Sequence, residues 1–150
     1  MNLDRDSEDI KNYQGEIDNL TAILQKDPDN VNCLMDRAEF YYLSNQIEKA
    51  IRDYERAILL EPNQALIYQS IAVCYAELDN FEKAMDCCRE ALKLEPELLN
   101  DLMAEPSLTH IVITLELESK ARSRLPTDRR ASLSNTSKYP KLNMPAFNRN

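Results

Sequence analysis

The chain has 150 residues, with 26 Asp and Glu against 18 Lys and Arg, a formal net charge of −8 and a single glycine. One glycine leaves little provision for hairpin turns that need positive φ, which argues against an all-β fold. No stretch approaches the roughly 20 apolar residues that span a membrane, and residues 1–9 are acidic and lack the apolar core of a secretory signal. We therefore expect one modest domain that does not insert into a membrane.

The four cysteines limit the chemistry that the chain can carry. They are Cys33, Cys74, Cys87 and Cys88. In a chain without a secretory signal they favour a reducing compartment over a disulfide framework. No CxxC pair occurs, and the single histidine, His110, is far away in sequence, so we expect no zinc site. We predict buried thiols, no metal or other cofactor, and a cytoplasmic location, with a nuclear one left open.

The first predicted element is a helix over residues 7–26, preceded by an N-terminal extension of residues 1–6. Ser7 can cap this helix, because its hydroxyl oxygen can accept a hydrogen bond from a free N–H of the first turn. The helix should stop before Asp27-Pro28, since a residue that precedes proline resists the α conformation. The apolar residues that follow the spacing of one helical face are Ile10, Tyr13, Ile17, Leu20 and Leu24.

Residues 31–64 and 65–98 then repeat one pattern with a period of 34 residues. The matching pairs include Ala38 and Ala72, Tyr41 and Tyr75, Ala57 and Ala91, and Leu60-Glu61-Pro62 and Leu94-Glu95-Pro96. A fixed period of this length is typical of stacked units that cannot bury their apolar faces alone. The repeat therefore predicts a solenoid, and solenoids mostly bind other molecules.

The repeated pattern resembles the tetratricopeptide repeat over about residues 12–98. The matching residues are Leu34, Ala38, Tyr41, Ala50, Tyr54, Ala57 and Pro62 in the first unit, and Tyr68, Ile71, Ala72, Tyr75, Ala84, Cys88, Ala91 and Pro96 in the second. Leu34 and Tyr68 stand where the family usually has Trp, and Cys88 stands where it usually has an aromatic residue. The resemblance implies an all-α solenoid of antiparallel helix pairs, with residues 7–30 as a partial first unit.

Within each full unit the resemblance implies two helices, over residues 31–43 and 47–60 and over residues 65–78 and 81–94. The small alanines let these helices approach closely. The aromatic residues Tyr41, Tyr54, Tyr68, Tyr75 and Phe81 are expected to fill the core around them.

Beyond Pro96 the match to the repeat fades, and residues 99–125 are expected to form capping helices. Residues 98–104 can form a short helix that ends at Glu105-Pro106. Ser107 is then expected to cap a longer helix that runs to about Arg124. A helix with one apolar face can close the open end of a solenoid. That face would consist of Leu108, Ile111, Val112 and Leu115.

Residues 126–150 are rich in Ser, Asn, Pro, Lys and Arg, and this composition predicts a disordered basic tail. Within it, Arg129-Arg130-Ala131-Ser132-Leu133 resembles the substrate motif of basophilic kinases. Ser132 is therefore a candidate phosphorylation site, although such short matches also arise by chance. A phosphate would lower the positive charge of the tail by nearly two units and weaken its attraction to an acidic solenoid.

The charges of the chain are distributed unevenly. Residues 1–105 contain 10 Lys and Arg against 23 Asp and Glu, a net charge of −13, whereas residues 106–150 carry +5. Such opposition favours a basic partner or self-association through the tail. Nucleic acid is a poor partner, because the acidic part would repel its phosphates.

In the tetratricopeptide repeat family the first helix of each unit lines a concave groove that contacts the partner. The resemblance therefore implies a groove lined by Asn32, Met35, Asp36, Glu39, Tyr42, Leu66, Gln69, Ser70, Val73 and Glu77. This mixture of acidic and apolar groups predicts a peptide or helical partner with apolar anchors and some Lys or Arg. The alternative is that these residues form only a solvated helix face.

Some members of the family bind the acidic C-terminal tails of heat-shock chaperones through a clamp of Lys, Asn and Arg. The corresponding positions here hold Asp36, Leu66 and Ser70. An aspartate would repel the bound carboxylate, and neither Leu66 nor Ser70 can donate a charge-assisted hydrogen bond. We therefore expect that these acidic tails are not the ligand.

The sequence contains no glycine-rich phosphate loop, no GxSxG motif and no paired histidines. His110 is interpreted as a surface residue, so we predict no catalytic residue and no enzyme activity. The favoured function is a protein-interaction adaptor. Two alternatives stay open: an assembly subunit that self-associates through its incomplete terminal unit, and a self-inhibited module whose basic tail occupies the groove.

Overall fold

The computed structural model describes residues 3–126, and their side chains from residue 12 onward. Its elements, in chain order, are α1 (Leu3–Lys26), α2 (Val31–Leu43), α3 (Ile47–Leu60), α4 (Ala65–Glu77), α5 (Phe81–Leu94), the short 3₁₀ helix η1 (Pro96–Leu98), α6 (Leu99–Ala104) and α7 (Thr109–Ser123). The described residues contain no strand, so the predicted all-α fold is confirmed. The predicted disorder of the tail falls on residues outside the described part, apart from residue 126.

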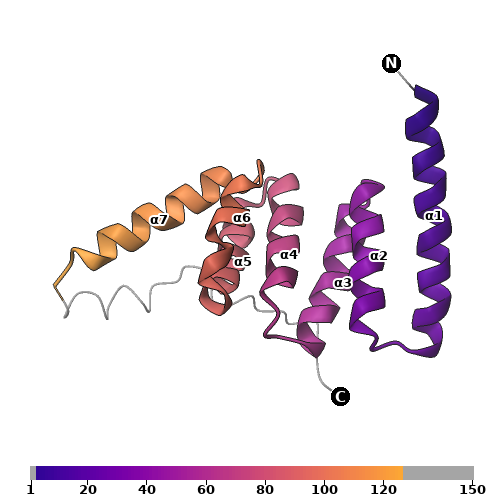
Figure 1. Ribbon diagram of the computed structural model, residues 1–150, viewed down its shortest axis with the longest axis horizontal. Helices are drawn as coiled ribbons and strands as arrows, with labels where there is room; N and C mark the ends of the chain where they lie inside the picture. Colours follow the sequence, from indigo (N-terminus) through magenta and orange to yellow (C-terminus); the bar gives the residue numbers. More distant parts are fainter. Residues whose placement is uncertain (1–2, 127–150) are drawn as a thin grey trace.

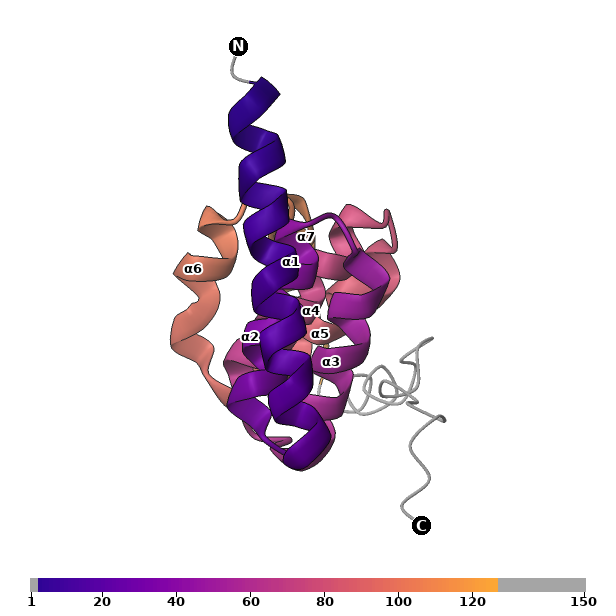
Figure 2. The same cartoon turned by 90° about the vertical axis from the view of Figure 1, so that its right-hand side faces the viewer.

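The helices stack in the order of the chain. Each of α1 to α4 contacts the next helix, and α5 contacts both η1 and α7. Figure 1 shows α1 to α5 side by side, with α7 projecting obliquely from the far end. In Figure 2 the stack is seen from its N-terminal end, where α1 lies in front of α2 and α3 and extends beyond them. This arrangement confirms the predicted solenoid.

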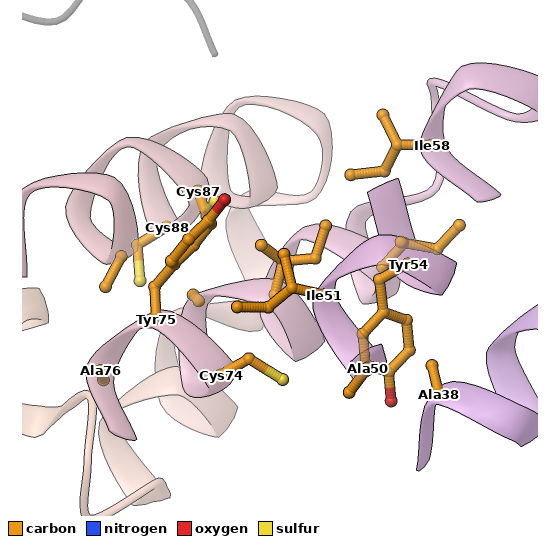
Figure 3. Packing of buried hydrophobic residues seen from close by; sticks show 14 of the residues in the cluster. Ala38, Ala50, Ile51, Tyr54, Ile58, Cys74, Tyr75, Ala76, Cys87 and Cys88 are labelled. Carbon is orange, nitrogen blue, oxygen red and sulfur yellow. The ribbon is translucent and has the colours of Figure 1, made fainter. Parts of the chain in front are cut away.

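Small residues at the repeated positions let the helices pack closely. Six alanines, three per unit, have no exposed surface: Ala38, Ala50, Ala57, Ala72, Ala84 and Ala91. Figure 3 shows Tyr54 extending past Ala50, and Tyr75 lying beside Cys87 and Cys88. Tyr54 and Tyr75 are buried as predicted, and burial raises both of their pKa values.

Phe81 is a correction to the predicted core, because half of its surface is exposed. The equivalent residue of the first unit, Ile47, is buried and has a complete unit after it. Phe81 is the first residue of α5, and only the short η1 and α6 and the oblique α7 follow. The period alone does not distinguish an internal position from one at the end of a stack.

The turn between the two helices of each unit uses a residue in the left-handed backbone region. Asn45 has φ 59° and Asp79, which lies 34 residues later, has φ 56°. Asn and Asp adopt this conformation more readily than other non-glycine residues. The next residue in each turn donates its N–H to the end of the preceding helix, from Gln46 to Tyr41 at 2.8 Å and from Asn80 to Tyr75 at 2.8 Å. These bonds satisfy carbonyls that the helix end would leave free.

Two predicted helix starts are wrong. α1 begins at Leu3, so the residues after position 2 that were assigned to an extension are helical and Ser7 is not the N-cap. α7 begins at Thr109, and its N-cap is Leu108 instead of Ser107. The Thr109 hydroxyl donates hydrogen bonds to the carbonyls of Met103 and Glu105, both at 3.0 Å, and so fixes the corner before α7.

An ion pair that the sequence did not indicate ties α1, α2 and α3 together. Arg37 donates two hydrogen bonds to the Asp53 carboxylate, at 2.6 and 2.8 Å, and one to the Thr21 hydroxyl at 3.0 Å. Asp53 is the one buried charged residue of the described part of the chain, with 7% of its surface exposed. The hydrogen bond to Asp53 raises the already high pKa of Arg37. A buried carboxylate in a bidentate pair holds the three helices in one register.

Candidate binding groove

A groove of about 490 Å³ lies along the first helices of the two units. α2 and α4 supply most of its wall, α3 supplies one residue, and the corner after α6 supplies another. Its lining consists of Met35, Asp36, Glu39, Tyr42, Tyr54, Leu66, Gln69, Ser70, Val73, Cys74 and Glu105. The repeat places these side chains together, because residues three and four apart on a helix share a face.

Eight of the ten predicted groove residues lie in this lining, and two do not. Asn32 is in the first turn of α2 and Glu77 is the last residue of α4, so both lie at helix ends outside the groove wall. Both side chains are exposed. Glu77 nevertheless acts on the groove, because its charge is one of the causes that raise the pKa of Tyr42.

Three lining residues were missed by the sequence-based prediction. Tyr54 belongs to the second helix of its unit, and Cys74 is buried on α4 at the base of the groove. Glu105 reaches the groove because the chain turns at the end of α6, on the α2 side of the stack in Figure 2. The spacing on α4 could have indicated Cys74, which follows Ser70 by one helical turn. No signal in the sequence places Glu105.

The polar groups at the base of the groove are neutral at ordinary pH. Burial raises the pKa of Tyr42 and, more strongly, that of Tyr54, so both phenol groups keep their protons. Burial also raises the pKa of the Cys74 thiol to about 12. A thiol with so high a pKa is a poor nucleophile. The base of the groove therefore offers apolar surface and hydroxyl groups, without a reactive thiolate.

The rim of the groove is acidic. Asp36, Glu39 and Glu105 are in the lining, and no Lys or Arg of the described residues is among the lining residues. Ser70 is occupied within its own helix, where its hydroxyl donates to the Leu66 carbonyl at 3.1 Å. Arg37 adjoins Asp36 in sequence, but its guanidinium is bound to Asp53 and Thr21. The groove thus combines three carboxylates with the apolar side chains of Met35, Leu66 and Val73.

The rest of the described chain shows no assembled metal site. Residues 12–126 contain no group of three His, Cys, Asp or Glu side chains that could hold a metal ion. Cys74, Cys87 and Cys88 are buried and Cys33 is partly buried, and all four thiols are free. Among the described helices, none is both long and apolar enough to cross a lipid bilayer.

Stacked antiparallel helix pairs with a groove along their first helices define an α-solenoid repeat protein. The family model described as tetratricopeptide repeat matches residues 31–64 and again residues 65–98. The chain therefore contains two tetratricopeptide repeats and belongs to that family. Repeats of this family are generally modules for protein–protein interaction, and the chain is such a module.

Three relatives illustrate the similarity. The chain is 33% identical over 91 residues to the DnaJ homolog subfamily C member 7 homolog of Dictyostelium discoideum, over 58% of this chain and 17% of that protein. It is 54% identical over 37 residues to DnaJ homolog subfamily C member 3 of Homo sapiens, over 25% of this chain and 7% of that protein. It is 28% identical over 53 residues to the Hsp70-Hsp90 organising protein of Plasmodium falciparum, over 35% of this chain and 9% of that protein. The chain spans less than a fifth of the length of each.

Proposed function

We propose that the groove binds a segment of a partner protein that carries apolar side chains and at least one Lys or Arg. The observation that supports this proposal is the acidic lining, which combines Asp36, Glu39 and Glu105 with apolar side chains. Lysine or arginine of a ligand would pair with these carboxylates, while its apolar side chains would displace water from Met35 and Leu66. The chain would then act as an adaptor that binds and does not catalyse.

The same lining argues against an acidic ligand. One similar protein is named for Hsp70 and Hsp90, which makes the acidic tails of such chaperones the obvious ligand to consider. Asp36, Leu66 and Ser70 line the groove at the positions where a carboxylate clamp would need cationic or amide donors. An added carboxylate would meet three like charges, and like-charge contacts at an interface are unfavourable. We propose that the groove excludes such tails.

The proposal can be tested by selecting 12-residue peptides from a phage-displayed library on the immobilised full chain. We expect the selected peptides to combine Lys or Arg with apolar residues. Synthetic versions should bind with affinities that fall about tenfold or more in Met35→Glu and in Tyr42→Ala, since a buried charge or a lost aromatic contact each costs more than about 1 kcal/mol.

Leu117→Glu is the matched control, because Leu117 is an exposed apolar residue on α7 outside the groove lining. It should leave the affinity unchanged, and circular dichroism should show equal helicity for all variants. Selected peptides that are acidic, or that bind Met35→Glu as well as the wild type, would overturn the proposal.

Self-assembly through the N-terminal end is the second candidate function. The main contacts of α1 in the described chain are with α2, and Ile23 on α1 is 45% exposed. An exposed apolar side chain at the open end of a solenoid could stack on a second copy. Sedimentation equilibrium across the micromolar range would show a dimer that Ile23→Glu abolishes. A monomer at every concentration would rule this candidate out.

We further propose a cytoplasmic or nuclear location. The support is the state of the cysteines, since Cys87 and Cys88 are free and fully buried side by side on α5. Free thiols persist in reducing compartments.

A further inference from the structure

We propose that residues 138–149 of this same chain bind in the groove between α2 and α4. This inference rests on the proposed function of the groove and names a ligand for it. The segment would compete with any partner for the same lining. The chain would thus carry a built-in competitor, and a partner would have to displace it.

The chemistry of the segment complements that of the groove. Its sequence is Lys-Tyr-Pro-Lys-Leu-Asn-Met-Pro-Ala-Phe-Asn-Arg, with cations at Lys138, Lys141 and Arg149 and no Asp or Glu. Four of its residues can serve as apolar anchors: Tyr139, Leu142, Met144 and Phe147. The groove supplies three carboxylates and no cation in its lining. Opposite charges on an apolar base favour association.

The segment can also reach the groove. Glu105 lines the groove, and α7 begins only four residues later, at Thr109. A 15-residue helix is about 22 Å long, and four residues span at most about 13 Å, so the end of α7 lies within about 35 Å of Glu105. The 14 residues from Arg124 to Lys138 can span up to about 46 Å. The covalent connection therefore permits binding within one molecule.

One other cleft of the described chain fits this segment poorly. The cleft between α5 and α7, of about 320 Å³, is lined by Arg89, Lys93 and Arg122 beside Leu92 and Leu115. Its single carboxylate, Glu118, already accepts a hydrogen bond from Arg89 at 2.8 Å. A segment with three cations would be repelled there. Charge therefore selects the groove between α2 and α4 over the cleft at the C-terminal end.

The test uses the full chain with p-benzoylphenylalanine at position 147, in place of Phe147, and maps the photo-crosslinks by mass spectrometry. We expect crosslinks within one molecule to residues of α2 and α4, with Met35 and Leu66 among them. Their yield should be the same at about 1 and about 20 µM protein, whereas the yield of crosslinks between two copies would rise with concentration. Asp36→Lys with Glu39→Lys should lower the yield about threefold to tenfold, because two attractive contacts become repulsive.

Glu48→Lys is a charge-reversal control away from the groove, since Glu48 is exposed on α3 and outside the groove lining. It should leave the crosslink yield unchanged, whereas Lys138→Glu with Lys141→Glu should lower it as the groove variants do. Crosslinks that map to α5 and α7, that join two molecules, or that persist in the Asp36→Lys and Glu39→Lys variant would overturn the inference. Library peptides that still depend on Met35 would show that the groove binds ligands while its own tail is not one of them.

Discussion

Arg37 and Asp53 occupy positions that the second unit fills with Ile71 and Cys87, each 34 residues further along. Ile71 and Cys87 are fully buried, so the second unit has apolar residues at the positions where the first unit joins its two helices by a charged pair. A buried ion pair is costly to break but can often be replaced by apolar residues of similar volume. The two units thus offer two solutions to one packing problem within the same chain.

Asp53→Cys should therefore destabilise the fold by about 2–3 kcal/mol, because it leaves the Arg37 guanidinium partly buried without its carboxylate. The double variant Arg37→Ile with Asp53→Cys copies the pair of the second unit and should lie within about 1 kcal/mol of the wild type. Urea unfolding followed by circular dichroism measures both. A double variant that is less stable than Asp53→Cys would contradict the replacement argument.

Arg56→Ala, which removes an exposed ion pair with Asp29, should lower the free energy of unfolding by less than about 0.5 kcal/mol.

The buried thiols make stability depend on alkaline pH. Burial raises the pKa values of Cys74 and Cys88 from an ordinary value of 9.0 to about 12, and raises that of Cys87 well above 9.0. Between pH 9 and 12 the unfolded chain therefore loses thiol protons that the folded chain retains. The contribution of these thiols to stability should be constant below about pH 8.5 and should fall as pH rises toward 12.

Urea unfolding at pH 7.5, 9 and 10.5 tests this dependence, and Cys74→Ala should show a shallower decline than the wild type. Cys33→Ala is the control, since Cys33 is only partly buried. A decline that is equally steep in Cys74→Ala would assign the pH dependence to other groups. In the native state at pH 8, a thiol reagent such as Ellman's reagent should react with Cys33 well before the other three.

At the residue scale the sequence predicted the groove better than the core contacts. Met35 and Glu39, like Leu66 and Ser70, share a helix face by their spacing, and spacing is visible in a sequence. Glu105 and the partner of Arg37 depend on how separate helices meet, which no periodicity encodes. The predicted and the observed lining therefore both contain three carboxylates, but Glu105 is present in place of the predicted Glu77.

At the element scale, the ends of the helices inside the repeat were predicted to within one residue. Prolines and the left-handed turns at Asn45 and Asp79 mark the ends of the helices in each unit. The tertiary packing of the helices repeats together with the sequence. Outside the repeat, α1 starts four residues before Ser7 and α7 starts two residues after Ser107. A serine before an apolar face permits a cap but does not require one.

The cap helix α7 should contribute to stability through one face only. Ile111 is buried against the core cluster, whereas Leu117 on the same helix is 62% exposed. Ile111→Ala should lower the free energy of unfolding by about 2–4 kcal/mol, because it removes buried methyl groups and leaves a cavity. Leu117→Ala should change it by less than about 0.5 kcal/mol. Equal effects of the two substitutions would show that α7 does not bury Ile111 in solution.

At the scale of the whole molecule, two repeats are fewer than the roughly three units that a solenoid usually needs. α1 packs on α2 and α7 packs on α5, so elements outside the two repeats extend the stack on both sides. The chain that leads from α6 into α7 also shapes the groove, because it places Glu105 in the groove lining. The cap therefore contributes both to stability and to the electrostatics of the site.

The proposed competition by the tail should respond to phosphorylation. Ser132 lies outside the described residues, six positions before the segment that we propose as a ligand of the groove. Residues 129–150 carry five Lys and Arg and no Asp or Glu, so one phosphate would cancel roughly two of five positive charges. Ser132→Glu should lower the yield of the Phe147-position crosslink about twofold at 50 mM NaCl, and less at 500 mM, where salt screens the attraction.

Ser132→Ala is the control, because it removes the hydroxyl without adding charge, and it should match the wild type at both salt concentrations. An equal yield for Ser132→Glu and Ser132→Ala would mean that the tail is held by its apolar side chains alone. A stronger crosslink in Ser132→Glu would exclude attraction by Asp36, Glu39 and Glu105 as the cause of binding. The variants at Ser132 and in the groove thus test the charge of the tail and the charge of the groove on the same molecule. Only attraction between these two charges predicts that added salt lowers the crosslink yield.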